Sequence, residues 1–191
     1  MALKVSPEML EQHKDQLSYF ITNQDLDQFV RGASEHVERY GELDDKYKSI
    51  YELLPTNNSY QFILTESEPN LGHWCIIMRY GNTVEWFDPY GGSPTSSLKF
   101  IPKIMNRVLD NTPSDIKDLV KTIEKGDKFV WNKAKFQYDH PLVNTCGRHC
   151  LSRLQCMLLG MDLKQYQSFM RKQSKALGLP FDVVSCLFIR I

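Results

Sequence analysis

One cysteine of the sequence, Cys146, stands where a thiol can become a nucleophile. It opens the segment CGRHCLSRLQCMLLG, whose apolar residues recur at helical spacing until Gly160 ends the pattern. A thiol at the first turn of a helix lies at the positive end of the helix dipole, which stabilises the thiolate. Gly147 would let a substrate backbone approach closely, and the Cys146 amide would be one donor to an oxyanion. The sequence therefore predicts acyl-transfer chemistry at Cys146.

A base for this thiol is expected from another part of the chain, because a histidine on the same helical turn would rarely point correctly at both thiol and substrate. His73 opens an apolar run directly after a glycine, and Asp88 ends a second run fifteen residues later. The short turn Gly81-Asn82 predicts a hairpin that brings both side chains onto one face. The carboxylate would then fix the tautomer of the imidazole. His140 and His149 are the reserve bases.

These motifs, taken in order, resemble a known family. Gly72-His73-Trp74, Phe87-Asp88-Pro89-Tyr90-Gly91, a glutamine and Cys146-Gly147 follow one another. They are similar to the adenovirus-type maturation proteases and to the proteases that process ubiquitin-like proteins. The version FQ…NTCGRHC looks especially like the proteases of virophages and of Polinton-type, virus-like transposons. The resemblance spans roughly residues 60 to 160.

The resemblance also implies roles for three further residues. In the family, the residue matching Trp74 packs by the active site and narrows the channel toward small substrate residues. The glutamine donates a hydrogen bond to the oxyanion, and Gln137 is its best match here. Gln137 lies nine residues before Cys146, farther than in relatives, so the side-chain amide of Asn144 is the alternative donor. Asp88 agrees with the branch that processes ubiquitin-like proteins, whereas adenovirus-type enzymes carry glutamate.

Composition limits the partners and the compartment. Lys+Arg and Asp+Glu both total 23, so there is no global field for nucleic acid, and nucleic-acid binding is not indicated. The DNA and peptide cofactors of adenovirus-type enzymes are accordingly not carried over, and no cofactor is expected. No apolar run approaches the length of a membrane span, and the start lacks a signal-peptide pattern. We expect an intracellular protein, in a host cell or a virion, with five free thiols.

A zinc site is the main rival use of the cysteines. Cys146, His149 and Cys150 offer thiolate and imidazole ligands, but no second ligand pair follows at a usual spacing. We therefore expect no metal. Arg148 and Arg153 on the same helix are expected to be surface or structural residues.

The periodicity of the chain predicts one α+β domain over residues 1–191, and the resemblance implies that this domain has the papain-like fold. Its mixed, mostly antiparallel sheet would pack against helices, including the one that Cys146 opens. Expected strands cover Tyr60–Thr65, His73–Tyr80, Thr83–Asp88 and Lys128–Gln137. Expected helices cover Leu26–Tyr40 after a capping box at Thr22 and Asp25, part of Leu98–Leu109, the segment after Cys146, and Asp162–Leu177. Val183–Ile189 would complete the core.

The resemblance implies a cysteine endopeptidase, a viral maturation protease that cuts capsid or other structural proteins after small residues such as Gly. One alternative is an isopeptidase that removes ubiquitin-like modifiers. Others are an acyltransferase and a catalytically inactive binding module of the same fold. The sequence leaves the cleavage motif, activation and the oligomeric state open.

Overall fold

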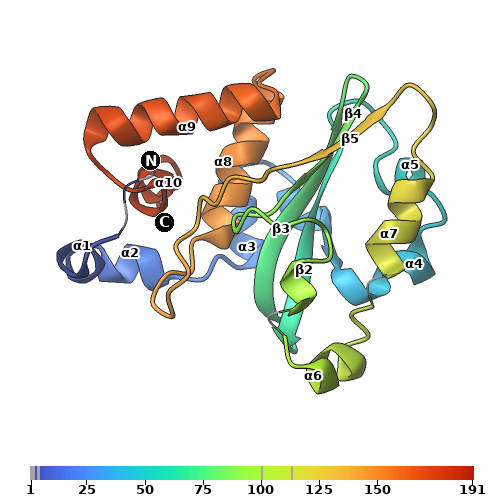
Figure 1. The fold of residues 1–191 in the computed structure, drawn as a ribbon, viewed down its shortest axis with the longest axis horizontal. Helices are drawn as coiled ribbons and strands as arrows, with labels where there is room; N and C mark the ends of the chain where they lie inside the picture. Colours follow the sequence, from blue (N-terminus) through green and yellow to red (C-terminus); the bar gives the residue numbers. More distant parts are fainter. Residues whose placement is uncertain (1–2, 4, 100, 113) are drawn as a thin grey trace.

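The computed structural model describes residues 3, 5–99, 101–112 and 114–191. Within that part of the chain, five strands form one sheet with helices on both faces (Figure 1). The strands are β1 (Val37–Arg39), β2 (Tyr60–Glu68), β3 (Leu71–Tyr80), β4 (Thr83–Phe87) and β5 (Lys128–Trp131). The helices are α1 (Pro7–Gln12), α2 (Lys14–Ser18), α3 (Asn23–Leu26), α4 (Leu43–Lys46), α5 (Ile50–Leu53), α6 (Lys103–Val108), α7 (Ser114–Lys121), α8 (Cys146–Leu158), α9 (Leu163–Leu177) and α10 (Phe181–Phe188).

The sheet is mixed, and its strands lie in the order β1-β2-β3-β4-β5. The three central strands are antiparallel, whereas β1 and β5 each join an edge in parallel. The predicted hairpin joins β3 to β4, with Tyr80 paired to Thr83 and Gly81 at φ +52° in the turn. The α+β class that the sequence predicted is thus confirmed.

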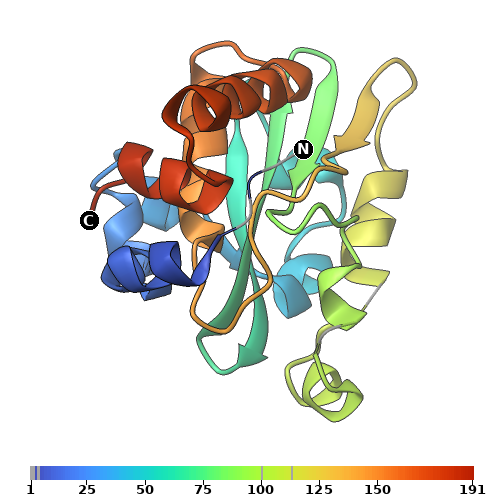
Figure 2. The ribbon, with the colours of Figure 1, turned by 60° about the vertical axis from the view of Figure 1, so that its left-hand side comes forward.

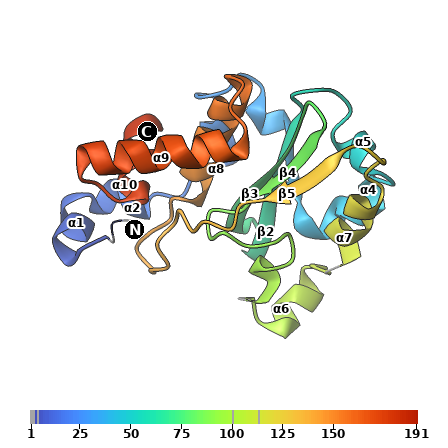
Figure 3. The same cartoon turned by 45° about the horizontal axis from the view of Figure 1, so that its top comes forward.

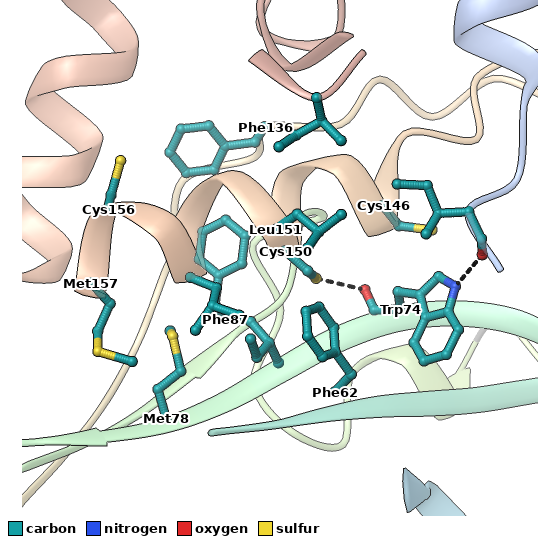
Figure 4. Close-up of a cluster of buried hydrophobic side chains, with 14 of the residues drawn as sticks. Phe62, Trp74, Met78, Phe87, Phe136, Cys146, Cys150, Leu151, Cys156 and Met157 are labelled. Atoms are coloured by element: carbon teal, nitrogen blue, oxygen red, sulfur yellow. Dashed lines mark hydrogen bonds between the residues drawn. The ribbon is translucent and has the colours of Figure 1, made fainter. Parts of the chain in front are cut away.

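Successive side chains along each strand point to opposite faces of the sheet, so the strands contribute to two apolar layers. On one face, Phe62, Met78 and Phe87 pack against the inner face of α8 (Figures 1 and 4). On the other face, Ile63 and Ile77 lie in the cluster that also holds the buried residues of α4, α5 and α7. Figure 3 shows the sheet between these two sets of helices. Helix α8 is therefore fixed to the sheet along its length by hydrophobic burial.

A buried ion pair adds a second link between α8 and the sheet. The Nε of Arg153 lies 2.8 Å from Oε1 of Glu85, and its Nη2 lies 2.7 Å from Oε2 of the same carboxylate. Both side chains are fully buried. Arg148 is also buried, and its guanidinium donates to the carbonyls of Ile189 and Tyr19. Both arginines thus have structural roles inside the protein rather than positions on its surface.

The predicted helix over Leu26–Tyr40 was wrong. The capping box at Thr22 and Asp25 exists, but it begins only the short helix α3. Gly32 then adopts φ +77°, and Val37–Arg39 forms β1, which pairs in parallel with β2. Pairing with a strand much later in the chain overrides the local helical spacing.

The last part of the chain follows the predicted pattern more closely. Helix α9 begins at the reciprocal cap of Asp162 and Gln165, and ends before Gly178 at φ +68°. Helix α10 then lies beside α2 near the C-terminus (Figure 2).

The predicted strand over Lys128–Gln137 is shorter in the structure, where β5 ends at Trp131. In the described residues, no helix has both the length and the apolar character needed to cross a membrane.

Candidate active site

A pocket of about 390 Å³ gathers five of the seven residues that the sequence predicted for the site. His73 comes from β3, Asp88 follows β4, and Cys146 opens α8. Gln137 and Asn144 come from the segment that leads to α8. Among the described residues that line the pocket, the other two predicted residues, Trp74 and Gly147, are not found. The fold therefore brings residues from four separate segments to one cavity.

The histidine and the carboxylate make a direct hydrogen bond. Nε2 of His73 lies 2.8 Å from Oδ1 of Asp88, and the carboxylate is 2% exposed. The same oxygen accepts a hydrogen bond from the backbone amide of Tyr90 at 2.8 Å, which fixes its direction. Since Nε2 is engaged by Asp88, Nδ1 is the ring nitrogen left for proton exchange with a thiol.

The register of the hairpin explains why Asp88 reaches His73. Ile76 pairs with Phe87 across β3 and β4. Continuing that antiparallel register by one residue sets Asp88 beside Cys75, diagonal to His73 on the same side of the ladder. The predicted closeness of the two side chains therefore follows from a two-residue turn and an uninterrupted register.

Two neighbours that sequence reasoning missed complete the support of this pair. The ring of Tyr90 stacks on the His73 ring, with centroids 4.7 Å apart and an interplanar angle of 26°. The side chain of Asn132 accepts from the Asp88 amide at 2.8 Å and donates to its carbonyl at 2.6 Å. Tyr90 stands in the quoted Phe87 to Gly91 motif and could have been found there. Asn132 lies 44 residues beyond Asp88 and carries no local signal.

The surroundings of Cys146 favour its thiolate. Burial acts to raise the pKa of this thiol, but the hydrogen bond to His73 and the charge of the imidazolium act against it. Backbone amides of Trp74 and Gly147 add further hydrogen bonds to the sulfur, and the net result is a pKa below the ordinary thiol value. The thiolate is therefore present at a lower pH than in a free cysteine.

The pKa of the His73 imidazole is shifted upward, in the opposite sense to that of Cys146. Burial acts to lower its pKa, but contacts with Cys75, Asp88 and Cys146 raise it well above the ordinary histidine value. Burial also raises the pKa of the Cys75 thiol to about 12, so this thiol is neutral near pH 7. The charges that hold the imidazolium are accordingly those of Asp88 and Cys146. A thiolate beside an imidazolium is the pair that nucleophilic cysteine chemistry uses.

Both candidate oxyanion donors reach the pocket, and each has one amide hydrogen already in use. Nε2 of Gln137 donates to the carbonyl of Val143 at 2.8 Å, and Nδ2 of Asn144 donates to the carbonyl of Ser18 at 3.0 Å. A side-chain amide carries two donor hydrogens, so each residue keeps one. Gln137 is 2% exposed, and its Oε1 has no partner among the described residues.

Trp74 lies next to the site and is buried. Its indole Nε1 donates to the carbonyl of Ile21 at 3.0 Å, and its ring meets Phe62 edge to face (Figure 4). Its backbone carbonyl accepts a hydrogen bond from the Cys150 thiol. Trp74 thus holds the segment before α3 against β3, and its predicted contact with substrate stays a prediction.

The structure gives Gly147 a role in packing. A Cβ atom at this position would lie 2.8 Å from Cβ of Ile21, closer than real side chains approach. The glycine therefore lets Ile21 cover the first turn of α8. Its predicted part in admitting a substrate backbone stays a prediction.

The reserve bases do not reach the pocket in the described part of the chain. Nε2 of His149 faces Asp182 at 3.3 Å, and this histidine is fully buried. Nδ1 of His140 accepts from the amide of Leu142. His73 is therefore the histidine that shares the cavity with Cys146.

Metal ligands are the last alternative for these side chains. The rival zinc group of Cys146, His149 and Cys150, which the sequence did not favour, does not gather among the described residues. Instead, potential ligand atoms of His73, Cys75 and Asp88 lie within 4.8 Å of one another. The histidine and the carboxylate are already bonded to each other, and the Cys75 thiol is neutral, so this arrangement is better suited to acid–base work than to ligation.

The chain is similar to known viral proteins. No protein-family model matches it. The chain is 33% identical over 125 residues to the uncharacterized protein V9 of Sputnik virophage, covering 65% of this chain and 69% of that protein. In structure it is similar to the ASFV pS273R protease, with a TM-score of 0.47 and 16% identity, over 83% of this chain and 68% of the other. By its identity to V9 and the share of V9 that it covers, the chain belongs to the protein family of virophage V9.

Proposed function

We propose that this protein is a cysteine endopeptidase. The observation that carries the proposal is the pocket in which the Cys146 thiol, with its lowered pKa, meets a His73 ring that is bonded to Asp88. Structural cysteines in apolar surroundings have raised pKa values instead, as the Cys150 thiol does on the same helix. The difference between these two thiols separates a nucleophile from a packing residue.

The reaction follows from this geometry. The Cys146 thiolate attacks the carbonyl carbon of a peptide bond, and the oxyanion that forms accepts hydrogen bonds from the Cys146 amide and the free Gln137 amide hydrogen. The His73 imidazolium gives its proton to the leaving amine, which breaks the C–N bond and leaves a thioester on the sulfur. His73 then takes a proton from water as the water attacks the thioester, which releases the acid and restores the thiolate.

The biological role that fits best is maturation of viral particles. Membership of a virophage protein family and the resemblance of the motifs to maturation proteases both support it. The substrates would be capsid or other structural proteins, cut after small residues such as Gly, inside the host cell or the virion. The pocket of about 390 Å³ beside Cys146 is where such a substrate residue would bind.

The test is co-expression with the structural proteins encoded beside this chain in its source genome. We expect intact-mass spectrometry to find shortened capsid proteins with the wild-type chain and full-length ones with Cys146→Ala. Cys156→Ala is the matched control, because this cysteine lies on the same helix, outside the pocket lining. Identical capsid masses with wild type and Cys146→Ala would remove the maturation role.

A substrate panel distinguishes the nearest alternative. We expect peptides from the capsid cleavage sites to be hydrolysed, and fluorogenic ubiquitin and SUMO conjugates to stay intact. Cleavage of the conjugates without cleavage of the peptides would assign the site to isopeptidase chemistry.

A further inference from the structure

One carboxylate outside the pocket binds both ends of the loop that separates Gln137 from Cys146. Asp182 lies in the first turn of α10 and is 2% exposed. Its Oδ2 accepts the backbone amide of Tyr138 at 3.0 Å, and its Oδ1 accepts the hydroxyl of Thr145 at 2.5 Å. These two partners are the direct chain neighbours of Gln137 and Cys146.

The hydroxyl of Thr145 is used in an unusual way. Thr145 is the N-cap residue of α8, where a threonine ordinarily accepts hydrogen bonds from amides of its own first turn. Here its side chain makes no such bond within the described chain and donates to Asp182 instead. The hydroxyl oxygen accepts no amide of the first turn, and the Gly147 amide bonds to the Cys146 sulfur instead.

A third donor ties the same carboxylate to the next turn of α8. Nε2 of His149 lies 3.3 Å from Oδ1 of Asp182, and the ring is fully buried. Its Nδ1 has no partner in the described part of the chain. A buried charge is costly unless several donors satisfy it, and these three donors all belong to the loop or to α8.

We propose that Asp182 is a positioning residue for the proposed peptidase reaction. By binding both ends of loop 138–145 it sets the distance between the two oxyanion donors, the Cys146 amide and the Gln137 side chain. By accepting the Thr145 hydroxyl it fixes the residue that directly precedes the nucleophile. The inference rests on the proposed function, because an oxyanion forms only in acyl transfer.

A purely structural role would produce different kinetics. Alkylation of Cys146 by iodoacetamide needs the thiolate but no oxyanion hole, whereas hydrolysis of a peptide needs both. Loosening the loop should therefore slow peptide hydrolysis and leave alkylation unchanged. General destabilisation would lower both in proportion to the unfolded fraction.

The experiment compares Thr145→Val with Thr145→Ser in the full chain, using a capsid-site peptide and iodoacetamide. Losing one oxyanion donor costs roughly 100- to 1000-fold in kcat, so displacement of a donor in Thr145→Val should cost about 10-fold or more. We expect KM and the alkylation rate to stay within about twofold, and Thr145→Ser to recover the activity. Ser185→Ala is the control, since it removes a buried hydroxyl bond to the Asp182 carbonyl without touching the loop.

Three kinetic results would each overturn the inference. They are unchanged kcat in folded Thr145→Val, parallel loss of hydrolysis and alkylation, and an equal kcat loss in Ser185→Ala. A readout that does not depend on activity is hydrogen exchange of loop 138–145, which should quicken in Thr145→Val and Asp182→Asn. If the wild-type chain cleaves no peptide, the proposed function fails, and the exchange rates still decide whether Asp182 holds the loop. Unchanged hydrogen exchange of loop 138–145 in both variants would refute the positioning role of Asp182.

Discussion

Glu85→Gln removes one charge at the centre of the contact between α8 and the sheet while keeping the shape of the side chain. In the wild type, both carboxylate oxygens of Glu85 accept from the Arg153 guanidinium at 2.7–2.8 Å, and Oε2 also accepts from the hydroxyl of Tyr80. Both members of the pair are fully buried. The substitution therefore leaves a buried guanidinium without its counter-charge, and we expect the protein to unfold more easily.

The expected loss of stability in Glu85→Gln can be estimated because the ion pair is buried. Removing one partner of a buried ion pair typically costs about 3–5 kcal/mol, because the remaining charge stays out of water. For a chain of this size each kcal/mol lowers Tm by roughly 2–4 °C, so Tm should fall by roughly 6–20 °C. The exposed pair of Lys121 and Asp118 gives the matched control, and Asp118→Asn should change stability by less than about 1 kcal/mol.

Urea unfolding followed by fluorescence measures both variants. The double variant Glu85→Leu with Arg153→Met tests the cause, because an apolar pair of similar volume should recover most of the loss. A cost below about 1 kcal/mol for Glu85→Gln, or no recovery in the double variant, would show that the pair does not hold α8 as described.

Three further predictions concern the site and its support. Because the pKa of Cys146 is lowered, its alkylation rate should stay high below the ordinary thiol pKa of about 8.5 and fall only at more acidic pH. His73→Ala should restore ordinary pH dependence, and an unchanged profile would contradict the ion pair. Gly147→Ala should cost about 1–3 kcal/mol in urea unfolding through its clash with Ile21, and Ile21→Ala added to it should recover part. Trp74→Phe should lower stability in thermal melts by about 1–3 kcal/mol by leaving the Ile21 carbonyl unpaired, and an unaltered Tm would count against that bond.

The sequence predicted those parts of the fold whose causes are local. The β3–β4 hairpin follows from a two-residue turn between apolar runs, and α9 follows from its cap residues. The candidate pair of His73 and Asp88 could be predicted because that hairpin brings the two residues together, although Tyr90 and Asn132 complete its support. Cys146 could be placed at a helix start for a similar reason.

The features that sequence reasoning missed depend on distant partners. The segment Val37–Arg39 continues a helical spacing but becomes a strand, because β2 offers it an open edge. Asp182 lies far along the chain from the loop it binds, and an aspartate near the start of a helix is ordinarily a solvated residue. Only the packed structure brings such residues together.

The division of the candidate site between α8 and the sheet makes the reactivity of Cys146 a property of the assembled molecule. Besides the Gly147 amide of α8 itself, the groups that lower its pKa are the His73 ring and the Trp74 amide on β3, across the apolar contact between α8 and the sheet. A nascent or misassembled copy lacks the His73 contacts, so its thiol has a higher pKa and reacts more slowly near neutral pH. The fraction of copies whose Cys146 is alkylated quickly near neutral pH therefore measures how many copies have packed α8 against the sheet.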